Sequence, residues 1–119
     1  VLVSSAAALV GIANHEAIAA AKAGIIGLAL SAAASYANSN LRFNVVAPGL
    51  VDTKLTKAIT DNPAARKISE NMHPLARLGQ PVDIAAAICF FLDPENSWIT
   101  GQVLAVDGGL SCIRTKMKA

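Results

Sequence analysis

Apolar runs that alternate with helical stretches limit the folds open to this chain. Short apolar runs that stop at small or turn-forming residues are typical of buried strands, and the sequence has three: 1–4, 41–47 and 99–106. An Ala-rich stretch separates the first two, and a polar stretch followed by an apolar helix separates the last two. Strands that alternate with helices form parallel sheets, so the sequence predicts an α/β fold with right-handed crossovers and helices on both faces.

Local signals give the expected ends of the helices. Asn14 is the predicted N-cap of a long helix that runs to about Asn38. The polar stretch 53–72 predicts two short helices, split by Asp61-Asn62-Pro63. Gly79-Gln80-Pro81 introduces a further helix over about 82–92, with proline near its first turn, where helices accept it.

Composition excludes some classes of function. A length of 119 residues is enough for one small domain, and the 54% hydrophobic content suits helices packed on a buried parallel sheet. A net charge of +2 is too small to indicate a nucleic-acid partner. The basic tail residues Arg114, Lys116 and Lys118 are more readily a solvated terminus than a binding patch.

The stretch 17–34 is apolar enough to raise the question of a membrane span. Lys22 and Ser31 interrupt it, and alanine drives insertion poorly, so we predict a buried helix of a soluble domain and no membrane partner. Cys89 and Cys112 have neither redox nor metal-ligand spacing, and no secretory signal pattern opens the sequence. A cytoplasmic location is therefore predicted.

A three-stranded parallel sheet would be small and would leave the strand at 1–4 with an exposed hydrophobic edge. Folded proteins avoid such edges. We therefore expect residues 1–119 to form the C-terminal half of one doubly wound, Rossmann-type domain. The dinucleotide-binding half would then precede Val1.

Several motifs occur in a fixed order along the chain. Val3-Ser4-Ser5 follows the first strand, Ala21-Lys22-Ala23-Gly24 lies in the long helix, and 44–49 reads Asn-Val-Val-Ala-Pro-Gly. Then come Pro-Leu-Ala-Arg-Leu-Gly-Gln-Pro-Val-Asp-Ile-Ala at 74–85 and Ile-Thr-Gly-Gln-Val-Leu-Ala-Val-Asp-Gly-Gly at 99–109. Over residues 1 to about 111, this series resembles the C-terminal half of a short-chain dehydrogenase/reductase.

The resemblance implies hydride transfer between NAD or NADP and an alcohol or carbonyl substrate. It places Ser5 at the substrate oxygen and Lys22 at the ribose hydroxyls of the nicotinamide. The loop after the second strand would hold the nicotinamide carboxamide, through Pro48, Gly49, the backbone of Val51, and Thr53. The segment of about 53–73 would be the substrate lid, and a homo-oligomer (dimer or tetramer) is implied. Without the resemblance, Ser5 is a strand-end serine and Pro48-Gly49 a simple turn.

One position departs from the family pattern: Ile18 stands where the family has its catalytic tyrosine. Ile18 has no titratable proton, so Lys22 keeps a cofactor role but has no phenol whose pKa it could lower. His15, three residues earlier, lies on the same helical face and has an ordinary pKa near 6.5, which suits proton transfer. The alternative is that His15 only caps or decorates the first turn of the helix.

The missing tyrosine also leaves a second class of function open. The chain would then be a catalytically silent relative with a cofactor-sensing or assembly role. Among the remaining polar residues, Asn44 and Asp107 are expected to tie loops to strands, and His73 is expected in a surface loop. With only two histidines and no ligand cluster, no catalytic metal is expected.

Overall fold

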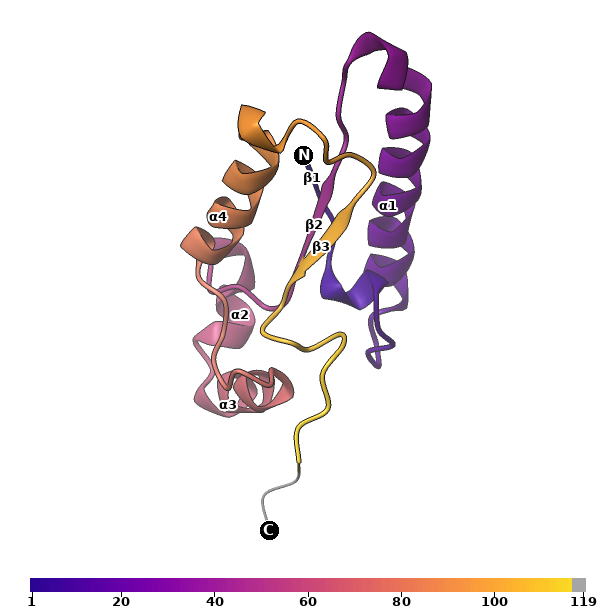
Figure 1. The fold of residues 1–119 in the computed structure, drawn as a ribbon. Coiled ribbons are helices and arrows are strands. Elements are labelled where there is room, and N and C mark those ends of the chain that lie inside the picture. Colours follow the sequence, from indigo (N-terminus) through magenta and orange to yellow (C-terminus); the bar gives the residue numbers. More distant parts are fainter. Residues whose placement is uncertain (117–119) are drawn as a thin grey trace.

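The computed structural model describes residues 1–116, which form one parallel sheet and the helices around it (Figure 1). The strands are β1 (Leu2–Val3), β2 (Val45–Pro48) and β3 (Val103–Val106). The α-helices are α1 (Glu16–Tyr36), α2 (Lys57–Thr60), α3 (Pro63–Met72) and α4 (Pro81–Leu92). Single 3-10 turns occur at η1 (Ala6–Ala8), η2 (Ala37–Ser39), η3 (Lys54–Thr56) and η4 (Pro94–Asn96).

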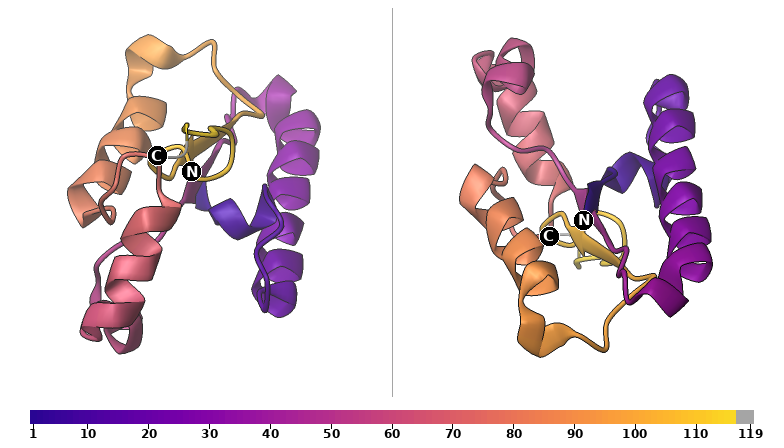
Figure 2. Two further views of the ribbon diagram at one scale, coloured as in Figure 1. Left: turned by 90° about the horizontal axis from the view of Figure 1, so that it is seen from below. Right: turned by 90° about the horizontal axis from the view of Figure 1, so that it is seen from above.

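The sheet has the strand order β1-β2-β3, and both pairings are parallel. Val46 of β2 lies opposite Val3 on one side and Leu104 on the other. Helix α1 covers one face of the sheet and α4 the opposite face, which is plain when the sheet is viewed along its strands (Figure 2). The predicted α/β architecture is therefore confirmed.

The expectation that every crossover is right-handed is wrong for one of them. The strand order runs in one direction while α1 and α4 lie on opposite faces, so the two connections have opposite hands. The connection through α1 is right-handed and the one through α4 is left-handed (Figure 2). A short crossover inherits its hand from strand twist. The second connection is long and first builds α2 and α3, which relaxes that constraint.

Strands β2 and β3 are both shorter than predicted, because a buried side chain replaces part of the ladder between them. Asn44, 2% exposed, donates from Nδ2 to the carbonyl of Ile99 and accepts at Oδ1 from the N–H of Gln102. Phe43 is tied to the same segment through Thr100 Oγ1 and through the N–H of Gly101. These bonds hold residues 41–44 and 99–102 side by side without strand geometry, and they confirm the structural role expected of Asn44.

The best-packed apolar cluster lies between α4 and the sheet. Val46, Ala87 and Phe91 are its buried members. Partly buried apolar side chains pack against them: Ile84, Ile88, Ile99 and Val106. Pro81 occupies the first turn of α4 and Asp93 follows its last residue, as predicted.

Helix α1 differs from its prediction in the position of its N-cap and in how many of its residues are buried. Asn14 has a left-handed backbone, φ 61°, and His15 is the N-cap residue, so the predicted cap is wrong by one position. Burial was predicted for the helix, yet only Ala29 and Ala33 are buried, because a sheet of three strands is too narrow to cover it. By length and composition alone, Glu16–Ser39 would suffice to cross a membrane.

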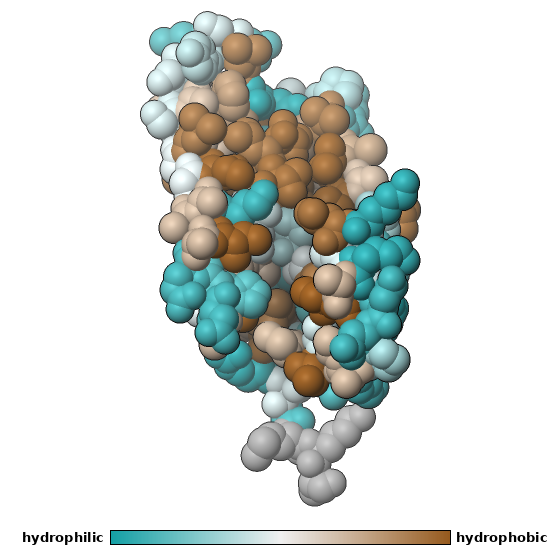
Figure 3. Space-filling model, turned by 180° about the vertical axis from the view of Figure 1, so that it is seen from behind, coloured by the Kyte–Doolittle hydropathy of each residue, from teal (hydrophilic) through white to brown (hydrophobic). Residues whose placement is uncertain are grey.

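The expected hydrophobic edge is present at β1. Val1 and Val3 are about 40% exposed, at 39% and 41%, although β1 is a strand of the sheet. Seen from behind, apolar side chains gather in a broad band across the upper part of this face, with polar surface below it (Figure 3). An exposed apolar surface of this kind is typical of faces that pack against further protein.

Candidate functional site

Parallel strands β1 and β2 end side by side, and the residues that follow them carry most of the predicted chemistry. After β1, the Ser4 hydroxyl donates to the carbonyl of Lys22 over 2.7 Å, and Lys22 Nζ donates to the carbonyl of Val3 over 3.1 Å. These two bonds fix α1 to the end of β1. Ser5 caps η1 by accepting from the N–H of Ala7 at 3.1 Å, which leaves the Ser5 hydroxyl proton available.

His15 is outside the helix and is held by its own loop. Its Nδ1 lies 2.8 Å from the carbonyl oxygen of Ala13. A carbonyl only accepts, so Nδ1 carries a proton and Nε2 is the nitrogen that exchanges one. The side chain makes no cap bond to α1, so a helix-capping role is not what holds it. Ile18 is in the first turn of the helix and is 45% exposed.

The loop after β2 is hydrogen-bonded to the turn that precedes α4. The backbone carbonyl of Leu50 accepts from the N–H of Gly79, and the backbone N–H of Asp52 donates to the carbonyl of Gly79, each over 2.9 Å. The carbonyl of Val51 accepts from Thr56 Oγ1 at 2.6 Å, and no partner for the Val51 N–H occurs among residues 1–116. Thr53 begins η3 in a capping box with Thr56. The loop therefore has a fixed shape.

An Arg–Asp pair fixes the turn that precedes α4. Arg77 donates twice to Asp83, over 2.7 and 3.0 Å, and the N–H of Gln80 donates to the same carboxylate over 2.7 Å. The Arg77 hydrogen bond and then that backbone donor lower the pKa of Asp83 from its usual 3.8 to about 2. Asp83 stays ionised near neutral pH and holds Gly79 in position against the loop.

A second ion-pair network ties the loop to helix α3. Arg66 on α3 bonds to Asp52 over 2.9 Å and to Glu70 over 3.1 Å. The hydrogen bond from Arg66 is the main reason that the pKa of Asp52 lies below its usual value, and the Asp52 bond in turn raises the pKa of Arg66. Nothing in the local sequence of this stretch signals the pairing, because Asp52 and Arg66 lie 14 residues apart.

His73 is buried at 5% exposure, so the prediction of a surface-loop histidine is wrong. Its Nε2 accepts from the N–H of Leu50 at 3.2 Å, and its Nδ1 lies 2.6 Å from the carbonyl of Ser69. These partners require a neutral ring with its proton on Nδ1. The ring thus joins the loop after β2 to the end of α3. A histidine before proline gives no sign of such a contact in the sequence.

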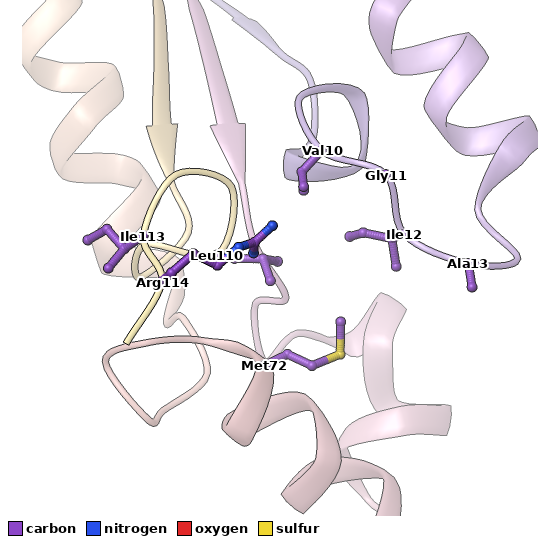
Figure 4. Close-up of a pocket in the computed structure, with 8 residues that line it drawn as sticks. All are labelled: Val10, Gly11, Ile12, Ala13, Met72, Leu110, Ile113 and Arg114. Atoms are coloured by element: carbon purple, nitrogen blue, oxygen red, sulfur yellow. The ribbon is translucent and has the colours of Figure 1, made fainter. Parts of the chain in front are cut away.

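Asp107 ends β3 and fixes the turn that follows. Its carboxylate accepts from the N–H groups of Gly109 and Ser111, each over 2.9 Å, which confirms the structural role expected of it. The turn leads into Leu110, Ile113 and Arg114, which line a cavity of about 330 Å³ with residues 10–13 and Met72 (Figure 4). A second cavity of about 400 Å³ lies between Gly49, His73 and the turn after β3.

The structure thus brings most predicted site residues to one end of the sheet. Lys22 bonds to Val3 and Ser4, the two residues before Ser5. Pro48 ends the neighbouring strand, and residues 49–53 follow it. His15 lies on a separate loop. Within the described residues, no three His, Cys, Asp or Glu side chains are arranged to hold a metal ion. Loops at the carboxyl ends of parallel strands are where α/β proteins bind ligands.

Fold and site together define an α/β protein of the Rossmann type, and comparison with known proteins gives its family. Residues 1–111 match the family described as enoyl-(acyl carrier protein) reductase. The 3-oxoacyl-[acyl-carrier-protein] reductase FabG of Vibrio harveyi is 42% identical over 108 residues, which cover 91% of this chain and 43% of that protein. The chain belongs to the short-chain dehydrogenase/reductase family of oxidoreductases.

Other relatives have different substrates in their names. Cis-4-hydroxycyclohexanecarboxylate dehydrogenase of Sinomonas cyclohexanicum is 41% identical over 93% of this chain and 44% of its own. Among solved structures, 4-hydroxyisoleucine dehydrogenase complexed with NADH matches with a TM-score of 0.88 and 27% identity, covering 95% of this chain and 47% of that one. ElxO with NADP bound matches with a TM-score of 0.84 and 32% identity, covering 92% and 45%. The chain spans less than half the length of these relatives.

Proposed function

We propose that the protein is an NAD(P)-dependent oxidoreductase that interconverts an alcohol and a carbonyl compound, and that residues 1–119 supply the nicotinamide-facing half of its domain. The observation that carries the proposal is the placement of Lys22. Its ammonium group donates to the carbonyl of Val3 at the end of β1, two residues before Ser5. The strand that pairs with β1, β2, leads into the loop that contains Val51 and Thr53. Relatives that hold NADH and NADP support a nicotinamide cofactor, without choosing between the two.

The residues at this end of the sheet fit such a cofactor. An ammonium group has three donors, and the bond to Val3 uses one of them, so Lys22 keeps donors for the ribose hydroxyls. The open N–H of Val51 and the hydroxyl of Thr53 would face the carboxamide, with Pro48 and Gly49 setting the path of the loop. When bound, the cofactor supplies or accepts the hydride.

Ser5 would orient the substrate. Its oxygen accepts from the N–H of Ala7, so the hydroxyl proton is not used in that bond and would be available to a substrate oxygen. A donor aimed at the carbonyl oxygen stabilises the negative charge that develops there during reduction. Lid helix α3, fixed to the cofactor loop through Arg66 and His73, would close over the substrate.

The proton step depends on the environment of Ile18, which we propose occupies the position of the family's tyrosine. With Nδ1 bound to Ala13, a protonated His15 has Nε2 free to donate, so His15 would replace the tyrosine directly or through a water. General acid catalysis contributes about 10²–10⁴-fold. His15→Ala should therefore lower kcat for carbonyl reduction by about that factor, while a matched neighbour, Glu16→Gln, leaves it unchanged.

Two variants of the whole protein distinguish this mechanism from its rivals. Unchanged turnover in His15→Ala would rule out the histidine as proton donor. If Ile18→Tyr creates or greatly raises reductase activity, the native site lacks a competent acid. The second candidate function, a catalytically silent relative with a cofactor-sensing or assembly role, is favoured by Ile18 itself. Binding of NADH or NADPH with no turnover across a panel of alcohols and ketones would establish that role.

We also propose that α1 packs against protein and does not cross a membrane. Lys22 and Ser4 fasten the helix to β1, and Ala33 packs near Gly101. Its exposed apolar side chains would be covered by the remaining half of the domain and by a second subunit of a homo-oligomer. A cytoplasmic location agrees with this arrangement. Size measurement of the whole protein by light scattering tests the oligomer.

A further inference from the structure

The cavity of about 330 Å³ is framed by three segments that are far apart in the sequence (Figure 4). The first is the loop 10–13, and the second is Met72 at the end of α3. The third is the segment after β3, which contributes Leu110, Ile113 and Arg114. Its size is at the lower end of the range for small-molecule sites, about 300–1,000 Å³. It therefore suits a small ligand.

The lining is apolar except for one charged side chain. Val10, Ile12, Met72, Leu110 and Ile113 contribute hydrocarbon or thioether surface. Arg114 supplies the charge, and its guanidinium nitrogens extend from the tail toward the loop 10–13 (Figure 4). An apolar wall with one placed polar group is the usual composition of a site that fixes a ligand's orientation.

Arg114 makes no side-chain hydrogen bond to any residue in the described part of the chain, 1–116. Every other arginine forms a side-chain hydrogen bond: Arg42 to backbone carbonyls, Arg66 and Arg77 to carboxylates. No such bond or ion pair involves Arg114 within residues 1–116. A guanidinium group offers five donors in a planar fork that matches a carboxylate or a phosphate.

The position of the cavity connects it with the proposed reaction. Its loop 10–13 joins Ser5 to His15, and Met72 ends the lid segment. We propose that this cavity binds the aliphatic part of an anionic substrate, and that Arg114 binds its carboxylate or phosphate group. That the ligand is the substrate rests on the proposed function. The binding itself does not.

The test measures binding to the whole protein by calorimetry, without cofactor and without turnover. Three probes with the same six-carbon chain separate the sources of affinity: hexanoate, hexyl phosphate and hexan-1-ol. We expect one or both anions to bind about five- to tenfold more tightly than the alcohol, since a charge-assisted bond at a partly exposed site is worth about 1 kcal/mol or slightly more. Preference for hexanoate identifies a carboxylate substrate, and preference for hexyl phosphate identifies a phosphate-bearing one.

Variants of the tail assign the preference to one side chain. Arg114→Ala should abolish it, and Arg114→Lys should restore part of it. Lys116→Ala removes the same charge from the same tail without lining the cavity, so it should keep the full preference. The proposal is overturned if no probe binds, if the anions bind no better than the alcohol, or if Arg114→Ala and Lys116→Ala behave alike. Anion binding without any turnover would contradict the proposed function but would still support an anion-binding site at this cavity.

Discussion

Gly49 is the position where one added methyl group should do the most damage. A Cβ there would lie 2.6 Å from His73 Nε2, 3.0 Å from Asp107 Cα and 3.1 Å from Asp107 Cβ. Ordinary contact begins at 3.4 Å, so the ring nitrogen must move by 3.4 − 2.6 = 0.8 Å. The Asp107 contact includes backbone, which gives way less easily than a side-chain end.

The cost of Gly49→Ala follows from the two ways of relieving this clash. Forcing a methyl group into a well-packed site costs about 1–3 kcal/mol. If His73 moves away, the Leu50 N–H loses its acceptor, and an unsatisfied buried donor costs about 1–3 kcal/mol. Because one movement relieves part of the other penalty, the two costs do not simply add. We expect the free energy of unfolding to fall by about 2–4 kcal/mol.

Urea denaturation followed by circular dichroism measures this change, with Gly24→Ala as the matched control. Gly24 lies in α1 and nothing is within 4 Å of the place its Cβ would take. Replacing an exposed helical glycine by alanine should stabilise the protein by up to about 1 kcal/mol. The same substitution should therefore have opposite signs at the two sites.

The double variant Gly49→Ala/His73→Ala tests the cause. Removing the ring also removes the closest clash, so the double variant should lose clearly less stability than the sum of the two single variants. A Gly49→Ala protein within about 0.5 kcal/mol of wild type would refute the reasoning, because surface substitutions without a structural cause fall in that range. Strict additivity would show that His73 and the loop do not meet as described.

Two further perturbations probe the supports of the site. Asn44→Ala should lower the free energy of unfolding by about 2–3 kcal/mol in the same urea assay, since it removes the two buried side-chain bonds from Asn44 to Ile99 and Gln102. Asp83 has a pKa lowered to about 2 by Arg77, so its contribution to stability is complete above about pH 5 and is lost as the pH falls from about 4 toward 2. The stability difference between wild type and Asp83→Asn should accordingly shrink over that acid range, and a constant difference would contradict the pairing.

Local pattern was sufficient for the elements and for their order. The sequence placed the strands within a few residues of their observed positions. Strand signals such as the apolar run 1–4 and the turn at Pro48-Gly49 depend only on side-chain hydrophobicity and on the backbone chemistry of neighbouring residues. Pro81 and Asn62 mark helix starts for the same reason. The motif series extended this to the family, which the comparisons establish.

Local sequence pattern did not predict the contacts between segments that are far apart in the chain. The position of His73 depends on its bond with Leu50, which is 23 residues away. The shortening of β2 depends on the bonds from Asn44 to Ile99 and Gln102, which lie far along the chain. The left-handed crossover through α4 follows from how the lid segment repositions the chain, and no local propensity encodes that.

The sequence by itself determined which elements form and which residues carry titratable or donor groups, because those properties belong to single side chains and their neighbours. The tertiary structure alone decided which of these groups meet. It turned Lys22 toward the end of β1, held His73 in one tautomer between the loop after β2 and the end of α3, and placed Arg114 at an apolar cavity. Such meetings depend on the packing of residues far apart in the chain, and that packing is a property of the whole fold.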